Sequence, residues 1–139
     1  MNQELITQLN QSFNQISQTW EDSGIEYWFA RDLQELLEYS EWRNFLKVIE
    51  KAKEACENSG GKVENHFVAV NKMVVIGSGA EREIDDIMLT RYACYLIAQN
   101  GNPRKDAIAF AQTYFALQTR KQELIEEQLR LQDRIQARE

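Results

Sequence analysis

Apolar side chains recur at helical spacing near the start of the chain. The first group is separated by four, four, three and four positions and consists of Leu5, Leu9, Phe13, Ile16 and Trp20. This spacing predicts an amphipathic helix that ends near residues 22–24. Residues 26–29 are expected to be extended, and the leucines within 33–37 predict a brief second helix. A third helix is expected to begin after Ser40, a good N-cap residue, and to run to about Asn58.

The pattern then changes to one that is typical of β-strands. Residues 67–70 and 73–76 are rich in β-branched side chains and form runs too short for helices. Residues 77–80 (Gly-Ser-Gly-Ala) supply a turn, and residues 83–85 are expected to form a return strand. This part of the chain therefore predicts a small antiparallel sheet.

Helical spacing returns at Leu89, and Gly101 provides a C-terminal stop for that helix. Asn102 is expected to cap a last helix, and Pro103 suits its first position. We expect this helix to run to the end of the chain, because no breaker follows. At ~1.5 Å per residue it would be about 50 Å long, which is longer than the folded body needs.

The final part of this helix, residues 121–139, has two interpretations. Leu117, Leu124 and Leu131 are seven residues apart, which favours a coiled-coil arm, although Lys121 and Gln128 would then occupy alternate core positions. Alternatively, the chain is a fragment cut within a helix that leads to a second domain, because it ends in Arg-Glu without a cap. The two interpretations can both hold.

Together these elements predict a mostly helical α+β fold, with a small antiparallel β-hairpin or sheet packed against helices and a long C-terminal helix. We expect three parts: an N-terminal amphipathic helix in residues 1–24, the main domain in 25–120, and an extension of the last helix in 121–139. Trp28, Trp42, Tyr92 and Phe115 are expected to lie in the core.

Composition supports one folded domain in the cytoplasm. The 139 residues are 43% hydrophobic, with one proline and six glycines, which is enough for a core and favours helices. No stretch reaches the ~20 apolar residues of a membrane span, and the polar N-terminus does not resemble a signal peptide. We expect Cys56 and Cys94 to be buried, reduced thiols.

Catalytic and metal-binding chemistry has few candidates. His66 is the one histidine and the two cysteines lie far apart, so no zinc spacing exists, although a pairing of His66 with Cys94 stays open. Glu83, Asp85 and Asp86 could bind magnesium, as a nuclease would require, but on a strand Asp86 would point away from the other two. We favour a structural role, with Asp86 capping the helix that follows. Residues 77–82 lack the ending of a phosphate-binding loop. We therefore expect no enzyme activity, no cofactor and no bound metal.

Charge is distributed unevenly along the chain. The formal net charge is −6, with four acidic residues and no lysine or arginine in residues 1–26. Residues 61–121 carry eight basic and six acidic residues, which makes this stretch mildly basic. Because phosphate contacts dominate the affinity of DNA-binding proteins, such a domain is expected to bind DNA weakly, or as one copy in an oligomer.

Several motifs resemble one bacterial family. The matching segments are residues 75–82, 84–105, with the specific run LTRYACYLIAQNG, and 111–120, together with the shorter pieces 28–33, 42–45 and 66–67. They are similar to the DNA-damage-inducible protein D (DinD) family over about residues 25–125. That family is similar in turn to the BRO-type N-terminal domain (BRO-N) of viral proteins and phage antirepressors, which is associated with DNA binding.

The resemblance implies a non-enzymatic, antirepressor-like role in the bacterial DNA-damage (SOS) response. The implied partners are DNA, single- or double-stranded, or recombination proteins such as the RecA recombinase. The basic residues within the matched motifs are the candidate contacts for DNA or a partner: Arg31, Arg43, Lys72, Arg82, Arg91, Arg104 and Lys105. The alternative is a protein-interaction or dimerisation domain without DNA contact, which the acidic net charge and the long last helix favour. Dimerisation, as a homo-oligomer, is compatible with both.

Overall fold

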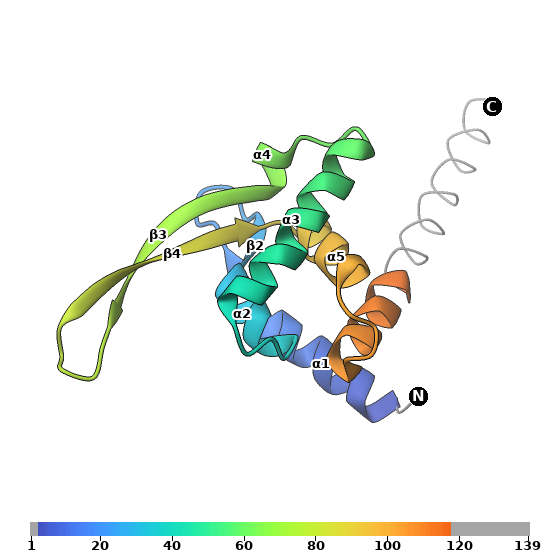
Figure 1. Ribbon diagram of the computed structural model, residues 1–139, viewed down its shortest axis with the longest axis horizontal. Helices are drawn as coiled ribbons and strands as arrows, with labels where there is room; N and C mark the ends of the chain where they lie inside the picture. Colours follow the sequence, from blue (N-terminus) through green and yellow to red (C-terminus); the bar gives the residue numbers. More distant parts are fainter. Residues whose placement is uncertain (1–2, 118–139) are drawn as a thin grey trace, which may run out of the picture.

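The computed structural model describes residues 3–117 of the chain (Figure 1). The elements in chain order are α1 (Gln3–Gln15), β1 (Gln18–Thr19), β2 (Glu26–Phe29), α2 (Ala30–Leu36), α3 (Trp42–Asn58), α4 (Val63–His66), β3 (Phe67–Val75), β4 (Glu81–Leu89) and α5 (Arg91–Asn100). Residues 106–117 are also helical. The α+β class is therefore confirmed. The predicted extension over residues 121–139 lies outside the described residues.

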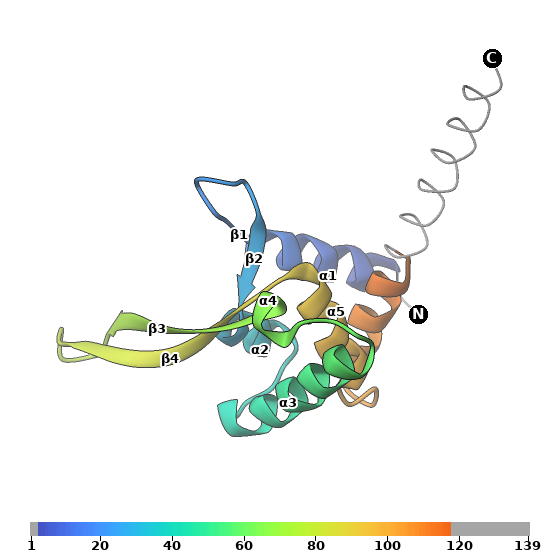
Figure 2. The same cartoon turned by 90° about the horizontal axis from the view of Figure 1, so that it is seen from above.

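The four strands form one antiparallel sheet in the order β1-β2-β4-β3. β3 and β4 pair residue for residue over nine positions, from Phe67 opposite Leu89 to Val75 opposite Glu81. β2 pairs only with the last two residues of β4. The β3–β4 hairpin, residues 67–89, therefore extends beyond the rest of the sheet, and Figures 1 and 2 show it projecting from the helical body. We call this hairpin the arm.

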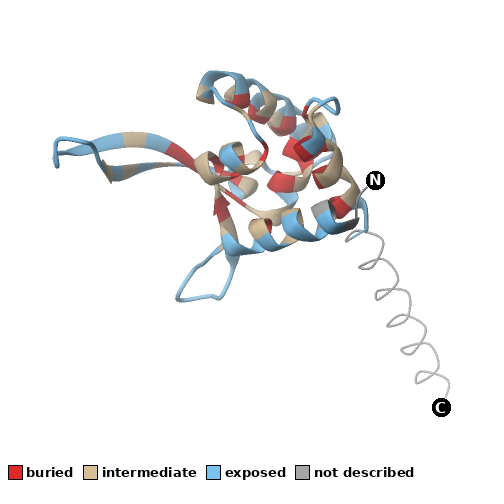
Figure 3. Ribbon diagram, turned by 90° about the horizontal axis from the view of Figure 1, so that it is seen from below, coloured by how far each residue is buried: buried red, intermediate tan, exposed pale blue. Residues whose placement is uncertain are grey.

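The arm has two parts that differ in burial. Its inner part, residues 67–70 and 86–89, contributes buried side chains such as Phe67 and Leu89 to the core. Its outer part, residues 71–75 and 81–85, contains no buried residue (Figure 3). The helical body thus covers only the end of the hairpin next to β2.

Trp28 of β2 is fully buried and joins the sheet to the helices. The Phe13 ring of α1 stacks on it with ring centroids 4.5 Å apart, and Trp28 Nε1–H donates to the Phe13 carbonyl oxygen at 2.9 Å. Phe115, from the helix over residues 106–117, meets Phe13 edge-on at 5.3 Å. These aromatic contacts hold the first helix, the sheet and the last described helix in one core. None of the described helices is long and apolar enough to cross a membrane.

The first helix is shorter than its periodicity predicts. α1 ends at Gln15 rather than near residues 22–24, and β1 follows at once. Trp20, the last member of the apolar series, is 48% exposed. Its backbone N–H donates to the Ile25 carbonyl oxygen across the turn between β1 and β2. Pairing of β1 with β2 therefore overrides helical spacing after Ile16.

The boundary between β4 and α5 was also predicted wrongly. Residue 89 ends a strand instead of starting a helix, and the cap of α5 is Thr90, whose side chain accepts a hydrogen bond from Ala93 N. Asp86 does not cap α5, because it lies within β4 and is buried. Leu89 fits both the alternating pattern of a strand and the spacing of the helix that follows. Its pairing with Phe67 of β3, at the end of a nine-residue ladder, places it in the strand.

Two further helix starts differ from the predicted positions. α3 begins at Trp42 with Glu41 as its N-cap residue, one position after Ser40. The last described helix begins at residue 106 instead of Pro103. Asn102 accepts the Arg104 N–H on Oδ1 at 3.0 Å and so stabilises a turn before the helix. A Cβ on Gly101 would lie 2.7 Å from Ile108 Cδ1, so a larger residue at this position would displace the buried Ile108 side chain.

The predicted core residues are confirmed only in part. Trp28 and Phe115 are buried, Trp42 is partly buried, and Tyr92 is 37% exposed. Cys56 and Cys94 are free and fully buried, as expected. Burial raises the pKa of the Cys94 thiol far above its ordinary value, so this thiol stays protonated.

Candidate functional site

Lys72 of β3 is held by the arm itself. Its Nζ lies 2.9 Å from Asp86 Oδ2 and 3.5 Å from the centroid of the Phe29 ring. The Asp86 side chain is fully buried, and its Oδ1 accepts the backbone N–H groups of Arg31 and Ile87. The Oδ2 contact lacks hydrogen-bond alignment, so we describe it as an ion pair. Lys72 thus neutralises the buried Asp86 carboxylate of β4, which lies beside the start of α2. Lys72 is therefore not free to bind a ligand.

Asp32, in the first turn of α2, belongs to the same charged cluster as Lys72 and Asp86. Burial raises its pKa above the ordinary value, while the Lys72 ammonium opposes this rise and the Asp86 carboxylate adds to it. The cluster therefore holds two carboxylates against one lysine. This balance is unfavourable for binding an anionic ligand.

Arg31 links α2 to the outer part of the arm. Its Nε–H donates to the Asp85 carbonyl oxygen at 2.7 Å, and its guanidinium lies 3.0 Å from Asp85 Oδ1. The same guanidinium lies 4.2 Å from the centroid of the Trp42 ring. Arg31 therefore braces the arm against the helical body. Its ion pair is with Asp85 of β4 and not with the neighbouring Asp32.

Arg91 at the start of α5 is engaged in a similar way. It bonds the Tyr114 hydroxyl at 3.3 Å and lies 3.4 Å from Glu26 Oε1. Its guanidinium is 5.1 Å from the centroid of the Trp28 ring. Burial alone would lower the pKa of Arg91, but the Tyr114 and Glu26 contacts outweigh this effect and raise it. Arg91 thus ties α5 to the core.

Three of the predicted cations lie at one end of the helical body. Ser59 Oγ and Tyr92 Oη, 3.3 Å apart, join the end of α3 to the start of α5, so the two helices run antiparallel. At their other end, Asn102 N–H donates to Tyr39 Oη at 3.3 Å. This contact brings the residues before α3 against those after α5. Arg104 and Lys105 therefore lie beside the loop that precedes α3, and Arg43 follows this loop in the first turn of α3. We call these three residues the basic end.

The side chains of the basic end differ in freedom. Arg43 is 82% exposed and lies 3.7 Å from Glu41 Oε2, a loose surface ion pair. Arg104 is exposed and has no ion pair among the described residues. Lys105 is more constrained, because its Nζ donates to the Glu38 carbonyl oxygen at 3.0 Å and lies over the Tyr39 ring. Arg43 and Arg104 are thus the side chains best able to reach a ligand.

Two helices begin at the basic end and add partial positive charge. α3 starts there, and the side chain of its N-cap residue Glu41 accepts a hydrogen bond from Asn44 Nδ2 but none from a backbone N–H of the first turn. The helix over residues 106–117 starts directly after Lys105. Backbone N–H groups at helix N-termini favour anions. The acidic side chains Glu41 and Asp106 also lie here, so the net positive charge is small.

Two lysines near this site are not among the residues predicted from the sequence. Lys47 and Lys51 are exposed on α3 and follow Arg43 at intervals of four residues. Residues four apart share one face of a helix, so the three cations form a row. The four-residue spacing could have revealed this row from the sequence. The two lysines were not considered because they lie outside the motifs that carry the family resemblance.

The last predicted cation, Arg82, lies on the outer part of the arm. It is exposed, pairs across the strands with Val74, and has no ion pair among the described residues. The structure therefore divides the seven predicted cations. The three residues Arg31, Lys72 and Arg91 serve internal contacts. Arg43, Arg104 and Lys105 gather at the basic end, and Arg82 stands alone.

The carboxylates considered for metal binding do not converge. Glu83 and Asp85 are exposed on one face of β4, whereas Asp86 points to the other face and is buried with Lys72. Asp85 is paired with Arg31. Within residues 3–117 no group of three or more histidine, cysteine, aspartate or glutamate side chains could hold a metal ion.

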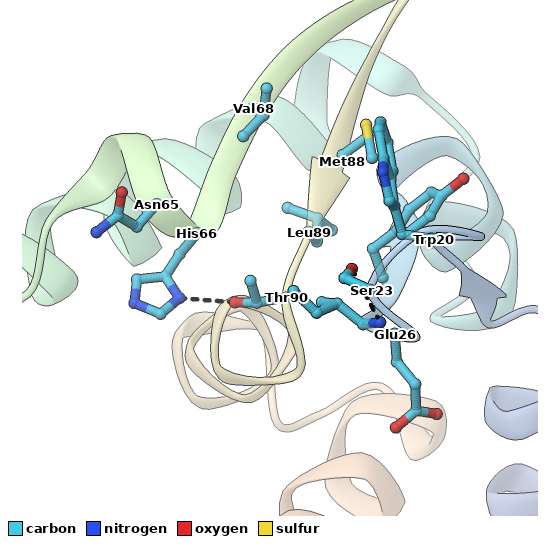
Figure 4. Close-up of a pocket in the computed structure, with 11 residues that line it drawn as sticks. Trp20, Ser23, Glu26, Asn65, His66, Val68, Met88, Leu89 and Thr90 are labelled. Atoms are coloured by element: carbon cyan, nitrogen blue, oxygen red, sulfur yellow. Dashed lines mark hydrogen bonds between the residues drawn. The ribbon is translucent and has the colours of Figure 1, made fainter.

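An apolar pocket of about 250 Å³ lies beside the sheet (Figure 4). Trp20 and Ile25 of the β1–β2 hairpin line it together with Val68 of β3, and His66 lies at its rim. His66, the last residue of α4, makes a 2.8 Å hydrogen bond to Thr90 Oγ1. The His66–Cys94 pairing that residue counting left open is not formed, since Cys94 is fully buried. The apolar lining favours an apolar side chain as occupant.

Comparison with known proteins identifies the family. Residues 15–116 match the model of the BRO family, N-terminal domain. The chain is 56% identical over 106 residues to DNA damage-inducible protein D of Escherichia coli (strain K12). That alignment covers 76% of this chain and 39% of the relative, so the chain spans well under half of that protein. No solved structure gives a significant match. The chain therefore belongs to the BRO family, whose N-terminal domain it contains, and it is similar to DNA damage-inducible protein D.

Proposed function

We propose that this chain is a non-enzymatic regulatory domain of a DNA-damage response and that it contacts DNA through the basic end. The family and the similarity to DNA damage-inducible protein D support the biological setting. The observation that carries the DNA contact is that the turn with Arg104 and Lys105 lies against the loop leading to Arg43, next to the start of a helix on each side. Arginine side chains and backbone N–H groups are the usual donors to phosphate oxygens.

The charge of the chain sets the strength of this contact. A net charge of −6 repels a nucleic acid at long range, so only a local site can bind it. With two or three phosphate contacts, binding should be weak and should fall steeply as salt rises. A second copy of the domain on the same DNA would strengthen binding, because the second contact becomes intramolecular.

The test is fluorescence anisotropy with labelled single- and double-stranded oligonucleotides over a range of salt concentrations. Arg104→Ala should weaken binding about three- to tenfold and lower the salt slope by about 0.9, the value for one lost phosphate contact. Arg82→Ala is the matched control, since it removes an equally exposed arginine from the arm. It should change affinity less than twofold.

Three results would count against this function. If the wild-type chain binds neither form of DNA at low salt, the DNA contact is wrong. If Arg82→Ala and Arg104→Ala weaken binding equally, the interface is not the basic end. If the chain cleaves the oligonucleotides in a metal-dependent way, it is an enzyme.

A second candidate function is contact with a protein, including the recombination proteins that the family resemblance implies. The observation in its favour is exposed apolar surface: Val68, Met73, Val75 and Ile76 of β3 and its turn are all more than 40% exposed. Val68 and Ile76 lie on one face of the arm, and Met73 and Val75 lie on the other. Such exposed apolar side chains are more typical of protein interfaces than of phosphate-binding surfaces. A direct binding measurement with a purified RecA-type recombinase, with and without DNA, distinguishes the two functions.

A further inference from the structure

The outer edge of β3 has the properties of an interface rather than of a finished sheet edge. β3 is the last strand of the sheet, and no described strand pairs with its outer side. Edge strands are usually protected by short length, proline, bulges, covering segments or charged side chains. β3 has nine residues, contains no proline, and pairs with β4 without interruption. Its one charged side chain, Lys72, is drawn onto Asp86.

The register identifies which backbone groups are available on this edge. Ile76 N–H donates to the Ala80 carbonyl oxygen, and Thr90 N–H donates to the His66 carbonyl oxygen. Both pairs continue the register of β3 with β4, so the even-numbered residues of β3 direct their backbone groups toward β4. The odd-numbered residues Ala69, Asn71, Met73 and Val75 therefore direct theirs outward. Among the described residues these groups have no hydrogen bond outside the sheet ladder.

We propose that the outer edge of β3 pairs antiparallel with β3 of a second copy of this chain, with the two-fold axis at Asn71. This register uses the full length of the strand, because Asn71 is its central residue. Asn71 lies opposite its own equivalent, and Ala69 lies opposite Met73 of the second copy. These are hydrogen-bonded pairs, because their backbone groups all point outward.

The side chains of β3 fit a second copy in this register. Lys72 lies opposite Val70, so no like charges face each other. Moving the two-fold axis by one residue to Lys72 would place two ammonium groups opposite each other. The acidic side chains of β4, such as Glu83, stay one strand away from the interface. The strand is therefore self-complementary about its centre, a property that an isologous dimer requires.

The pocket beside the sheet provides a second contact in the same dimer. Its mouth includes Val68 and His66, at the inner end of the β3 edge (Figure 4). In the proposed register Val74 of the second copy lies opposite Val68, and Ile76 of the second copy lies opposite His66. Even-numbered β3 residues share one face of the sheet, so Ile76, which is 42% exposed, comes to the side where the pocket opens. The two-fold axis repeats this contact, which widens an otherwise narrow strand interface.

Sedimentation equilibrium or light scattering on the full chain tests the proposal. The wild-type chain should be a dimer at tens of micromolar. Asn71→Asp places two negative charges opposite each other at the two-fold axis and should raise the dissociation constant several-fold. Met73→Pro removes an outward N–H on an edge strand, where proline is tolerated, and should leave only monomer. Gln11→Glu adds the same charge on an exposed position of α1 and should leave the dimer intact.

The outcomes are distinct. Far-ultraviolet circular dichroism and thermal unfolding should show that all three variants are folded, since Asn71 and Met73 are exposed. A wild-type chain that is monomeric at 100 μM overturns the proposal. A dimer that survives both Asn71→Asp and Met73→Pro assembles elsewhere and also overturns it. If the chain is a monomer and its β3 edge pairs with a strand of another protein, that protein and not a second copy is the occupant of the edge.

Discussion

The inner and outer parts of the arm share two strands and one uninterrupted register, yet they are stabilised differently. In the inner part, Phe67 and Leu89 face each other beneath the helical body and are buried. In the outer part, Met73 faces Glu83 and both are exposed. Isolated two-stranded hairpins are marginally stable in water. The comparison indicates that the inner part belongs to the core, whereas the outer part gains its stability from hydrogen bonds, from the Arg31–Asp85 brace and, in the proposed dimer, from the second copy.

The largest expected effect is on a core position of the inner part. Leu89→Ala removes a fully buried side chain and should lower the free energy of unfolding by about 2–5 kcal/mol. Met73→Ala, on the outer part, should change it by less than about 0.5 kcal/mol at concentrations where the chain is monomeric. Urea unfolding followed by circular dichroism measures both. Equal losses would mean that the two parts of the arm do not differ in their contribution to the core.

The next effect concerns Lys72, which lies at the boundary between the two parts. Lys72→Ala leaves the buried Asp86 carboxylate without its cation and should cost about 3 kcal/mol in unfolding free energy. Asp86→Asn in the same chain should recover part of this loss, because the uncompensated charge disappears. A double-mutant cycle from urea unfolding gives the coupling. A loss below about 0.5 kcal/mol for Lys72→Ala would show that the ion pair does not stabilise the boundary.

A smaller effect is the difference in thiol reactivity between the buried core and the exposed outer part of the arm. At pH 8 the native Cys56 and Cys94 should react slowly with a thiol reagent, because both are fully buried and the pKa of Cys94 is raised far above its ordinary value. Met73→Cys should add one thiol that reacts at once. The measurement is the time course of colour release by a disulfide reagent. If Cys94 reacts as fast as the introduced cysteine, the core opens far more readily than its packing indicates.

How much of the fold could be predicted depended on how local each signal is. β2, α2 and most of α3 were predicted from short apolar patterns, because their ends are set by nearby residues. The end of α1 and the extent of β4 depend on pairing with strands distant in the sequence. Helical spacing continued through Trp20 and restarted at Leu89, and neither position could reveal that a strand partner was present.

The candidate site shows the same division. The motifs that carry the family resemblance identified seven cations but not which of them face inward. Lys72 became a structural residue through Asp86, and Arg31 through Asp85 and Trp42. These contacts exist only once α2 lies against β4. The packing of the turn with Arg104 against the loop before α3 likewise depends on the antiparallel arrangement of α3 and α5.

Residue-resolved amide hydrogen exchange on β3 tests the proposed edge most directly. The N–H groups of Val70, Lys72 and Val74 point to β4 and should be protected at every concentration. Those of Ala69, Asn71 and Met73 should exchange freely in dilute solution and become protected as the concentration rises into the tens of micromolar. If these three amides stay unprotected where the measured mass is that of a dimer, the β3 edge is not the interface.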